Sequence, residues 1–143
     1  MKHSLPLRAL SRLLQYPDLE LMEHLPEVAA ALYEMPKLSK KVHLGLMEFV
    51  NNLEASDLMD SQENYVECFD RGRATSLHLF EHVHGDSRER GQAMVDLLQT
   101  YKEGGLQLSA NELPDHLSII LEFASTLPLD QAKQFVGEMA HIL

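Results

Sequence analysis

Histidine and carboxylate side chains are most densely placed in the run His78-Leu79-Phe80-Glu81-His82. The run fits the H-x-x-E-H pattern, in which two histidines of one helix bind Zn²⁺ and the glutamate acts as a general base. At about 100° per residue, His78, Glu81 and His82 share one arc of a helix, opposite the apolar side chains of the same stretch. A zinc-dependent hydrolase is therefore one hypothesis for the function.

A zinc peptidase of that kind needs more than these three residues. Its metal takes a third ligand inside an enclosed cavity, and such peptidases have large mixed α/β folds. His84 and Cys68 could supply further ligands, but a histidine-rich polar face is more often simply solvated. We therefore predict no catalytic residue and no metal site, and keep the hydrolase as the alternative to a binding protein.

Asp115 and His116 form a second pair of candidate residues, at the predicted start of a later helix. Asp115 is favourable there because a helix N-terminus carries partial positive charge. His116 falls by angle between Ile120 and Phe123, on the apolar side, where an ionisable ring needs a partner. Two interpretations of His116 remain open. It either faces a binding partner, or it is a core histidine whose hydrogen bonds are satisfied within the chain.

Other catalytic patterns are missing from the sequence. It contains no G-x-S-x-G, no Walker A loop and no C-x-x-C. Cys68 lies beside Phe69, a setting that predicts a small buried thiol rather than a nucleophile. Because Cys68 is the only cysteine, no internal disulfide can form, and a reducing compartment is the natural setting.

The elements that must position these residues are all predicted to be helices, since apolar residues recur at helical spacing and no alternating strand pattern is found. Ser39 is a predicted N-cap, Gly104-Gly105 a predicted helix end, and Ser109 with Glu112 a predicted capping box. Pro26 is expected to divide two helices or to kink one. The predicted helices cover 4–16, 18–33, 39–53, 58–70, 77–84, 86–103, 109–126 and 130–143. Gly85 is expected to end the fifth, and Asp86 with Glu89 to cap the sixth.

Length and charge exclude several classes of protein. The chain of 143 residues predicts a single all-α domain over 1–143, built as a bundle of about seven to nine helices. The net charge of -10 argues against a nucleic-acid surface and favours cationic partners. We find neither a secretory signal nor a stretch of transmembrane length, so the predicted location is the cytoplasm, with no direct membrane insertion.

Two long motifs then carry a resemblance to a known family. The runs YVECFDRGRATSLHLFEHVHGDSRERGQAMVDLLQTY and ELPDHLSIILEFAS closely resemble the NarJ-type assembly chaperones of respiratory nitrate reductase, within the TorD-like family. The likeness extends from LSRLLQYPD to about Ala124. It implies a non-catalytic, all-helical protein without a cofactor of its own. Such a protein binds the N-terminal peptide of the catalytic subunit and holds the apoenzyme for insertion of the molybdenum cofactor and iron–sulfur cluster, before membrane docking, as part of nitrate assimilation.

The resemblance also implies a peptide-binding site. The second motif implies signal-peptide recognition by Asp115 and His116, with Glu122 closing the motif. The first motif implies that aromatic side chains wall an apolar groove for the peptide helix, and these residues are Tyr65, Phe69 and Phe80. We expect Asp115→Ala and His116→Ala to weaken peptide binding at nearly unchanged melting temperature, and affinity to depend on pH between about 5 and 8.

The last predicted helix is still amphipathic at Leu143. Members of the family usually continue beyond the equivalent position, so the resemblance implies that the C-terminal tail of the family is lacking here. The uncovered apolar stripe of 130–143 then predicts a homodimer or an exchanged helix. A dimeric helical adaptor is accordingly a third, weaker hypothesis for the function.

Overall fold

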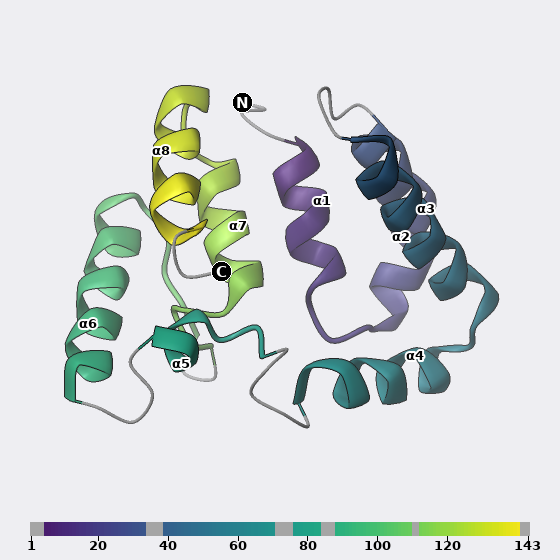
Figure 1. The fold of residues 1–143 in the computed structure, drawn as a ribbon, viewed down its shortest axis with the longest axis horizontal. Coiled ribbons are helices and arrows are strands. Elements are labelled where there is room, and N and C mark those ends of the chain that lie inside the picture. The colour runs from purple at the N-terminus through teal and green to yellow at the C-terminus, as the bar shows by residue number, and fades with distance from the viewer. Residues whose placement is uncertain (1–4, 34–38, 71–75, 84–87, 110–111, 141–143) are drawn as a thin grey trace.

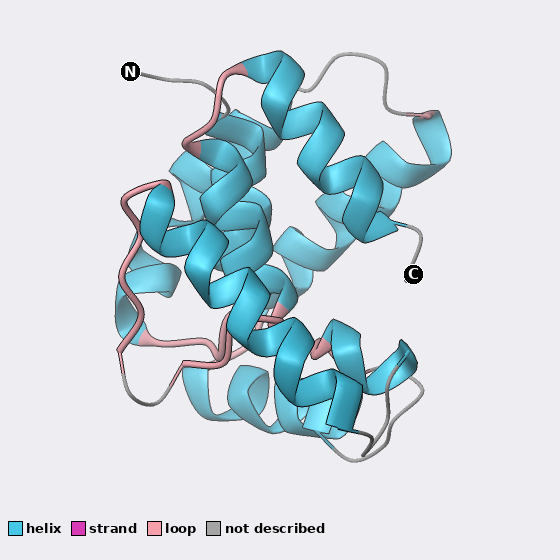
Figure 2. Ribbon diagram, turned by 90° about the vertical axis from the view of Figure 1, so that its left-hand side faces the viewer, coloured by secondary structure: helices cyan, strands magenta, loops and turns pink. Residues whose placement is uncertain are grey.

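The computed structural model describes residues 5–33, 39–70, 76–83, 88–109 and 112–140. These residues form eight α-helices and one π-helical segment (Figure 1), which confirms the predicted all-α class. The elements are α1 (Leu5–Leu13), α2 (Leu19–Tyr33), α3 (Lys40–Ala55), α4 (Leu58–Tyr65), η1 (Val66–Asp70), α5 (Leu79–Val83), α6 (Arg88–Glu103), α7 (Leu117–Ser125) and α8 (Leu129–Ala140). Figure 2 shows these helices joined by loops, with no strand in the described part of the chain.

Two apolar clusters fill the interior. The first belongs to α1, α2 and α3, and the second to α5, α6, α7 and α8. In Figure 1, α1 lies between α7 on one side and α2 with α3 on the other, while α4 crosses below them. The contact between α1 and α7 therefore joins the two clusters. A buried hydrogen bond marks it, because Ser11 Oγ donates to the Ser118 carbonyl over 2.5 Å.

Local sequence signals set several helix ends as predicted. Ser39 caps α3, where its Oγ accepts the Val42 N–H over 3.2 Å. The α6 helix ends at the glycine pair: Gly105 has φ +89°, and the Leu106 N–H donates to the Tyr101 carbonyl over 2.8 Å. This geometry is a Schellman motif, which needs a residue that tolerates positive φ.

Pro26 does not divide its helix, because α2 runs without a break from Leu19 to Tyr33. The alternative of two separate helices is therefore wrong. An internal proline costs about 3 kcal/mol through its missing N–H and its ring. Burial of apolar side chains on both sides of Pro26, among them Leu25 and Val28, offsets that cost.

Two other helices begin later than predicted. The α5 helix starts at Leu79 rather than at 77, and α7 starts at Leu117 rather than near Ser109. Ser109 N–H does donate to Glu112 Oε1 over 2.9 Å, so half of the capping box forms without a helix directly behind it. The reason is backbone pairing between the two segments: the Leu117 N–H donates to Leu77 O over 2.8 Å, and the Leu79 N–H donates to Asp115 O over 3.1 Å. The predicted signals at Gly85 and Asp86 lie outside the described residues.

The apolar stripe of α8 packs within the chain. Ala132 is 2% exposed, and the Phe135 ring lies 5.2 Å from the Phe123 ring of α7. Because this part of the stripe is already covered within the chain, it is not free to form a homodimer interface. The homodimer through this helix stays a prediction. None of the helices that the structure describes is long and apolar enough to cross a membrane.

Candidate functional site

The backbone pairing of residues 77–79 with 115–117 brings the two sequence motifs together. It forms an antiparallel bridge between His78 and His116, whose rings lie 5.0 Å apart at 81°. Thirty-eight positions separate these histidines in the chain. His78 therefore lies in the paired segment that precedes α5 and not on a helix face.

Asp115 lies beneath this histidine pair, and its side chain is fully buried at 0% exposure. Its Oδ2 accepts the backbone N–H of Phe80 over 3.0 Å, and its Oδ1 lies 3.6 Å from His78 Nδ1. The Phe80 N–H is one of the N–H groups that the first turn of α5 leaves without a helical acceptor. Asp115 thus caps α5 from a distant part of the chain and fixes His78 beside His116.

His116 is the N-cap of α7. Its Nδ1 accepts the Ser118 N–H over 3.2 Å and lies 2.8 Å from Ser118 Oγ. The acceptor role of Nδ1 places the proton of the neutral ring on Nε2. Burial, and then the neighbouring His78, lower the pKa of His116, while Asp115 and Asp70 oppose that shift more weakly. The imidazole is therefore held neutral and in a fixed orientation.

A groove of about 610 Å³ opens at His116 and joins four parts of the chain. We call it the His116 groove, and its lining residues are Gln15, Tyr16, Tyr65, His78, Glu112, Leu113, His116, Ser118, Ile119 and Glu122. Three predicted site residues, Tyr65, His116 and Glu122, meet in it. Glu112 and Glu122 line it, while no lysine or arginine of the described residues does. The His116 groove is accordingly acidic.

Tyr65 stands between this groove and a second one. Its Oη donates to the Leu14 carbonyl over 2.8 Å, and its ring meets the Tyr16 ring at 5.6 Å and the Phe69 ring at 5.0 Å. Burial, with a smaller effect of Asp70, raises the pKa of Tyr65 to about 12. The phenol is therefore neutral and fixed in place by its hydrogen bond.

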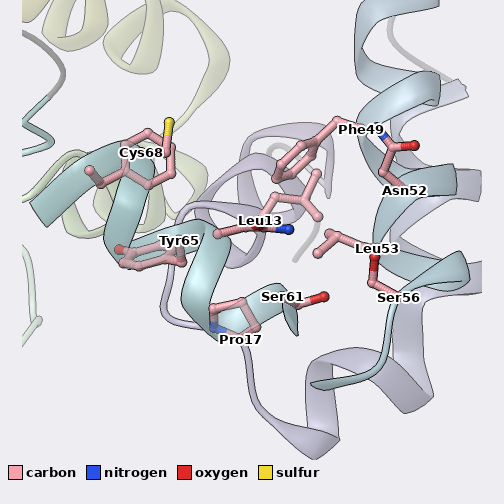
Figure 3. Close-up of a pocket in the computed structure, with 11 residues that line it drawn as sticks. Leu13, Pro17, Phe49, Asn52, Leu53, Ser56, Ser61, Tyr65 and Cys68 are labelled. Atoms are coloured by element: carbon pink, nitrogen blue, oxygen red, sulfur yellow. The ribbon is translucent and has the colours of Figure 1, made fainter. Parts of the chain in front are cut away.

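The second groove, of about 240 Å³, lies between α1, α3 and α4 with η1 (Figure 3). We call it the Phe49 groove, and its lining residues are Leu13, Pro17, Phe49, Asn52, Leu53, Ser56, Ser61, Asn64, Tyr65, Cys68 and Phe69. Tyr65 and Phe69, two predicted groove residues, belong to it. Cys68 is exposed at its edge, so the expected buried thiol is wrong.

Two predicted site residues are not on either groove. Phe80 is 5% exposed and belongs to the second apolar cluster, because α5 turns this side chain inward against α6 and α7. Asp115 is buried beneath the bridge, as described above. Neither side chain offers a surface for direct contact with a peptide: Phe80 packs in the second apolar cluster, and Asp115 accepts the Phe80 N–H at the start of α5.

The zinc hypothesis loses its geometric basis. His78 precedes α5, so it does not share a helix face with His82. His82 Nε2 lies 2.9 Å from the carbonyl of Ser76, and no three potential metal ligands gather among the described residues. The side chain of Glu81 lies outside the described residues. The prediction that His78 shares one helix face with Glu81 and His82 is therefore wrong.

Comparison with known proteins decides the family. The family model described as nitrate reductase delta subunit matches residues 19–141. The chain belongs to this family. It is 50% identical over 133 residues to the nitrate reductase molybdenum cofactor assembly chaperone NarJ of Escherichia coli K12, which covers 93% of this chain and 56% of that relative.

Two more relatives of the nitrate reductase delta subunit family extend the comparison. The probable assembly chaperone NarW of E. coli K12 is 48% identical over 96% of this chain and 56% of its own length. The probable NarJ of Bacillus subtilis 168 is 33% identical over 87% of this chain and 67% of its own length. The chain thus spans a little over half the length of the E. coli relatives. The predicted NarJ-type resemblance is confirmed, and these relatives are named as chaperones rather than as hydrolases.

Sequence reasoning missed several groove residues. Tyr16 follows α1, Phe49 lies in α3 and Ser61 lies in α4, and the sequence motifs point to none of them. The exposure of Tyr16 and Phe49 is the feature that sets them apart. Helical periodicity alone does not reveal it, because it shows which residues share a face but not how fully that face is covered.

Proposed function

We propose that this protein is a cytoplasmic assembly chaperone of nitrate reductase, which binds the N-terminal peptide of the catalytic subunit. In this proposal it holds the apoenzyme while the molybdenum cofactor and iron–sulfur cluster are inserted, before the enzyme docks at the membrane. Membership of the nitrate reductase delta subunit family and the names of the relatives, which are assembly chaperones, support the proposal.

The observation that carries the peptide-binding part is the meeting of both sequence motifs in the His116 groove. Tyr65 and His78 come from the first motif, and His116 and Glu122 from the second. An acidic groove in a chain of net charge -10 attracts a cationic segment and orients it on approach. The Phe49 groove, which shares Tyr65 with the His116 groove, adds apolar and aromatic walls. An amphipathic, basic helix is the ligand that suits this combination.

Isothermal titration with a synthetic N-terminal peptide of the catalytic subunit is the direct test. We expect saturable binding by the authentic peptide and none by a scrambled peptide of equal composition. If a cooperatively folded protein binds both peptides or neither, residues 1–143 do not contain a specific recognition site.

Variants of the His116 groove test where the peptide binds. We expect His116→Ala to weaken binding about tenfold, as removal of a contact near the centre of an interface does, and Glu122→Gln about threefold. Glu138→Gln on the exposed face of α8 makes the same charge change away from the groove and serves as control. Equal affinities for all three variants and the wild type, measured by titration, would place the peptide elsewhere.

The depressed pKa of His116 predicts how stability depends on pH. Because this pKa lies below the ordinary value of about 6.5, the unfolded chain binds more protons than the folded one as the pH falls through that value. The contribution to stability is complete above about pH 6.5 and is lost on acidification. Denaturation curves at several pH values should therefore show a steeper loss for the wild type than for His116→Asn, whose side chain can still cap α7. Parallel losses would remove His116 as the cause.

The affinity for the peptide should change over the same range if His116 faces it. A flat calorimetric profile between about pH 5 and 8 would separate the two roles of His116. It would leave this residue as a cap of α7 and exclude it from the recognition of the peptide.

A further inference from the structure

One polar atom in the Phe49 groove lacks the partner that its burial demands. Ser61 is 3% exposed, and its Oγ makes no hydrogen bond within the part of the chain that the structure describes. The carbonyl of Asp57, one turn earlier in the chain, accepts the backbone N–H of Ser61 over 3.1 Å. In Figure 3, the Ser61 hydroxyl points from α4 toward α3, into the groove. Buried hydroxyls are normally satisfied, so this one indicates a missing partner.

The walls around Ser61 suit a flat apolar group. Aromatic rings of Phe49, Tyr65 and Phe69 and the aliphatic side chains of Leu13 and Leu53 line the groove together with Ser61. Amide and hydroxyl groups lie at the rim, where Asn52, Asn64 and Ser56 are at least partly exposed. A volume of about 240 Å³ holds one large side chain, and it is below the range of about 300–1,000 Å³ of ordinary small-molecule sites.

We propose that the Phe49 groove binds one phenol side chain, a tyrosine of the bound peptide, whose hydroxyl pairs with Ser61 Oγ. The ring packs edge to face against Phe49 and Tyr65, an arrangement that aromatic pairs prefer. A phenylalanine or leucine side chain would fill the same space but leave the Ser61 hydroxyl without a hydrogen-bond partner. Its binding would therefore be weaker than that of tyrosine. The inference rests on the proposed function, because Tyr65 also lines the His116 groove and makes the two grooves neighbours.

Small aromatic probes test the chemistry of the groove without the peptide. Cys68, the only cysteine, lines the groove and is exposed, so its alkylation by N-ethylmaleimide reports occupancy. We expect p-cresol to protect Cys68 at about three- to tenfold lower concentration than toluene, which has the same ring without the hydroxyl.

Two serine variants isolate the hydroxyl. Ser61→Ala should remove the preference for p-cresol over toluene, while Ser56→Ala, the same change at the rim, should keep it. Because Ser61→Ala deletes an unsatisfied group, we expect the variant to melt no lower than the wild type, which excludes misfolding as the cause. Equal protection by p-cresol and toluene in the wild type, or a preference that persists in Ser61→Ala, would overturn the proposal.

Competition connects the groove with the peptide. We expect p-cresol, but not toluene at the same concentration, to lower the apparent affinity of the authentic catalytic-subunit peptide in the wild type. Binding of p-cresol without competition would overturn the anchor role of the groove. Failure of the peptide to bind at all, in the titration described above, is a different result, because it contradicts the proposed function itself and removes the tyrosine of that peptide as the occupant.

Discussion

Replacing Asp115 by alanine will lower the free energy of unfolding by about 2–4 kcal/mol, or the melting temperature by about 6–12 °C. The carboxylate is fully buried, accepts the Phe80 N–H and lies beside His78 Nδ1. Its removal leaves a buried N–H without an acceptor at the start of α5. Thermal and chemical denaturation followed by circular dichroism measure the effect.

This outcome differs from the expectation that the motif alone gave, which was loss of peptide binding at unchanged stability. Asp115→Asn is the matched control, since its amide oxygen can still accept the Phe80 N–H, and we expect it to lose about half as much stability. Peptide affinity should fall in Asp115→Ala because His78 and His116 lose their fixed positions. A melting temperature equal to that of the wild type would show that Asp115 is no structural cap.

Gly104→Ala is the second substitution with a large expected effect. A Cβ at this position would lie 2.5 Å from Cε1 and 2.8 Å from Cζ of Phe123. Phe123 cannot yield easily, because it is 3% exposed and its ring packs against Tyr101 at 4.9 Å and Phe135 at 5.2 Å. We expect a loss of about 1–3 kcal/mol in the free energy of unfolding, the usual cost of overpacking.

Gly45→Ala is the control for this prediction. Gly45 is exposed within α3, and a Cβ there would meet nothing within 4 Å. Because alanine favours the helix over glycine, this variant should gain up to about 1 kcal/mol. Denaturant titration of both variants gives the comparison, and a Gly104→Ala protein as stable as Gly45→Ala would contradict the close approach of α6 to Phe123.

Much of the fold could be predicted from the sequence because its signals are local. Apolar residues at helical spacing predict the helices, Ser39 predicts the start of α3, and the glycine pair predicts the end of α6. The errors lie where contacts between distant segments of the chain determine the start or the continuity of a helix. Pro26 stays inside α2 because both of its sides share one core, and α5 and α7 start late because residues 77–79 pair with 115–117.

The candidate site was predicted in part for the same reason. Tyr65, His116 and Glu122 do share a groove, and the motifs that suggested them are long and specific. Phe80 and Asp115 lie in the same motifs but are buried, since a motif preserves both contact residues and the residues that support them. Ser61 carries no signal in the sequence. Its interest arises only when packing shows a hydroxyl with no partner at the wall of a groove.

The seam between α1 and α7 has a consequence for synthesis on the ribosome. The hydrogen bond from Ser11 to Ser118 joins residues 107 positions apart, so the first helix emerges long before its counterpart. Helices α1 to α3 can gather around their own apolar cluster early. The His116 groove needs side chains from both ends of this interval, Gln15 and Tyr16 from one and His116 to Glu122 from the other. A nascent chain therefore has no complete His116 groove until α7 has left the exit tunnel.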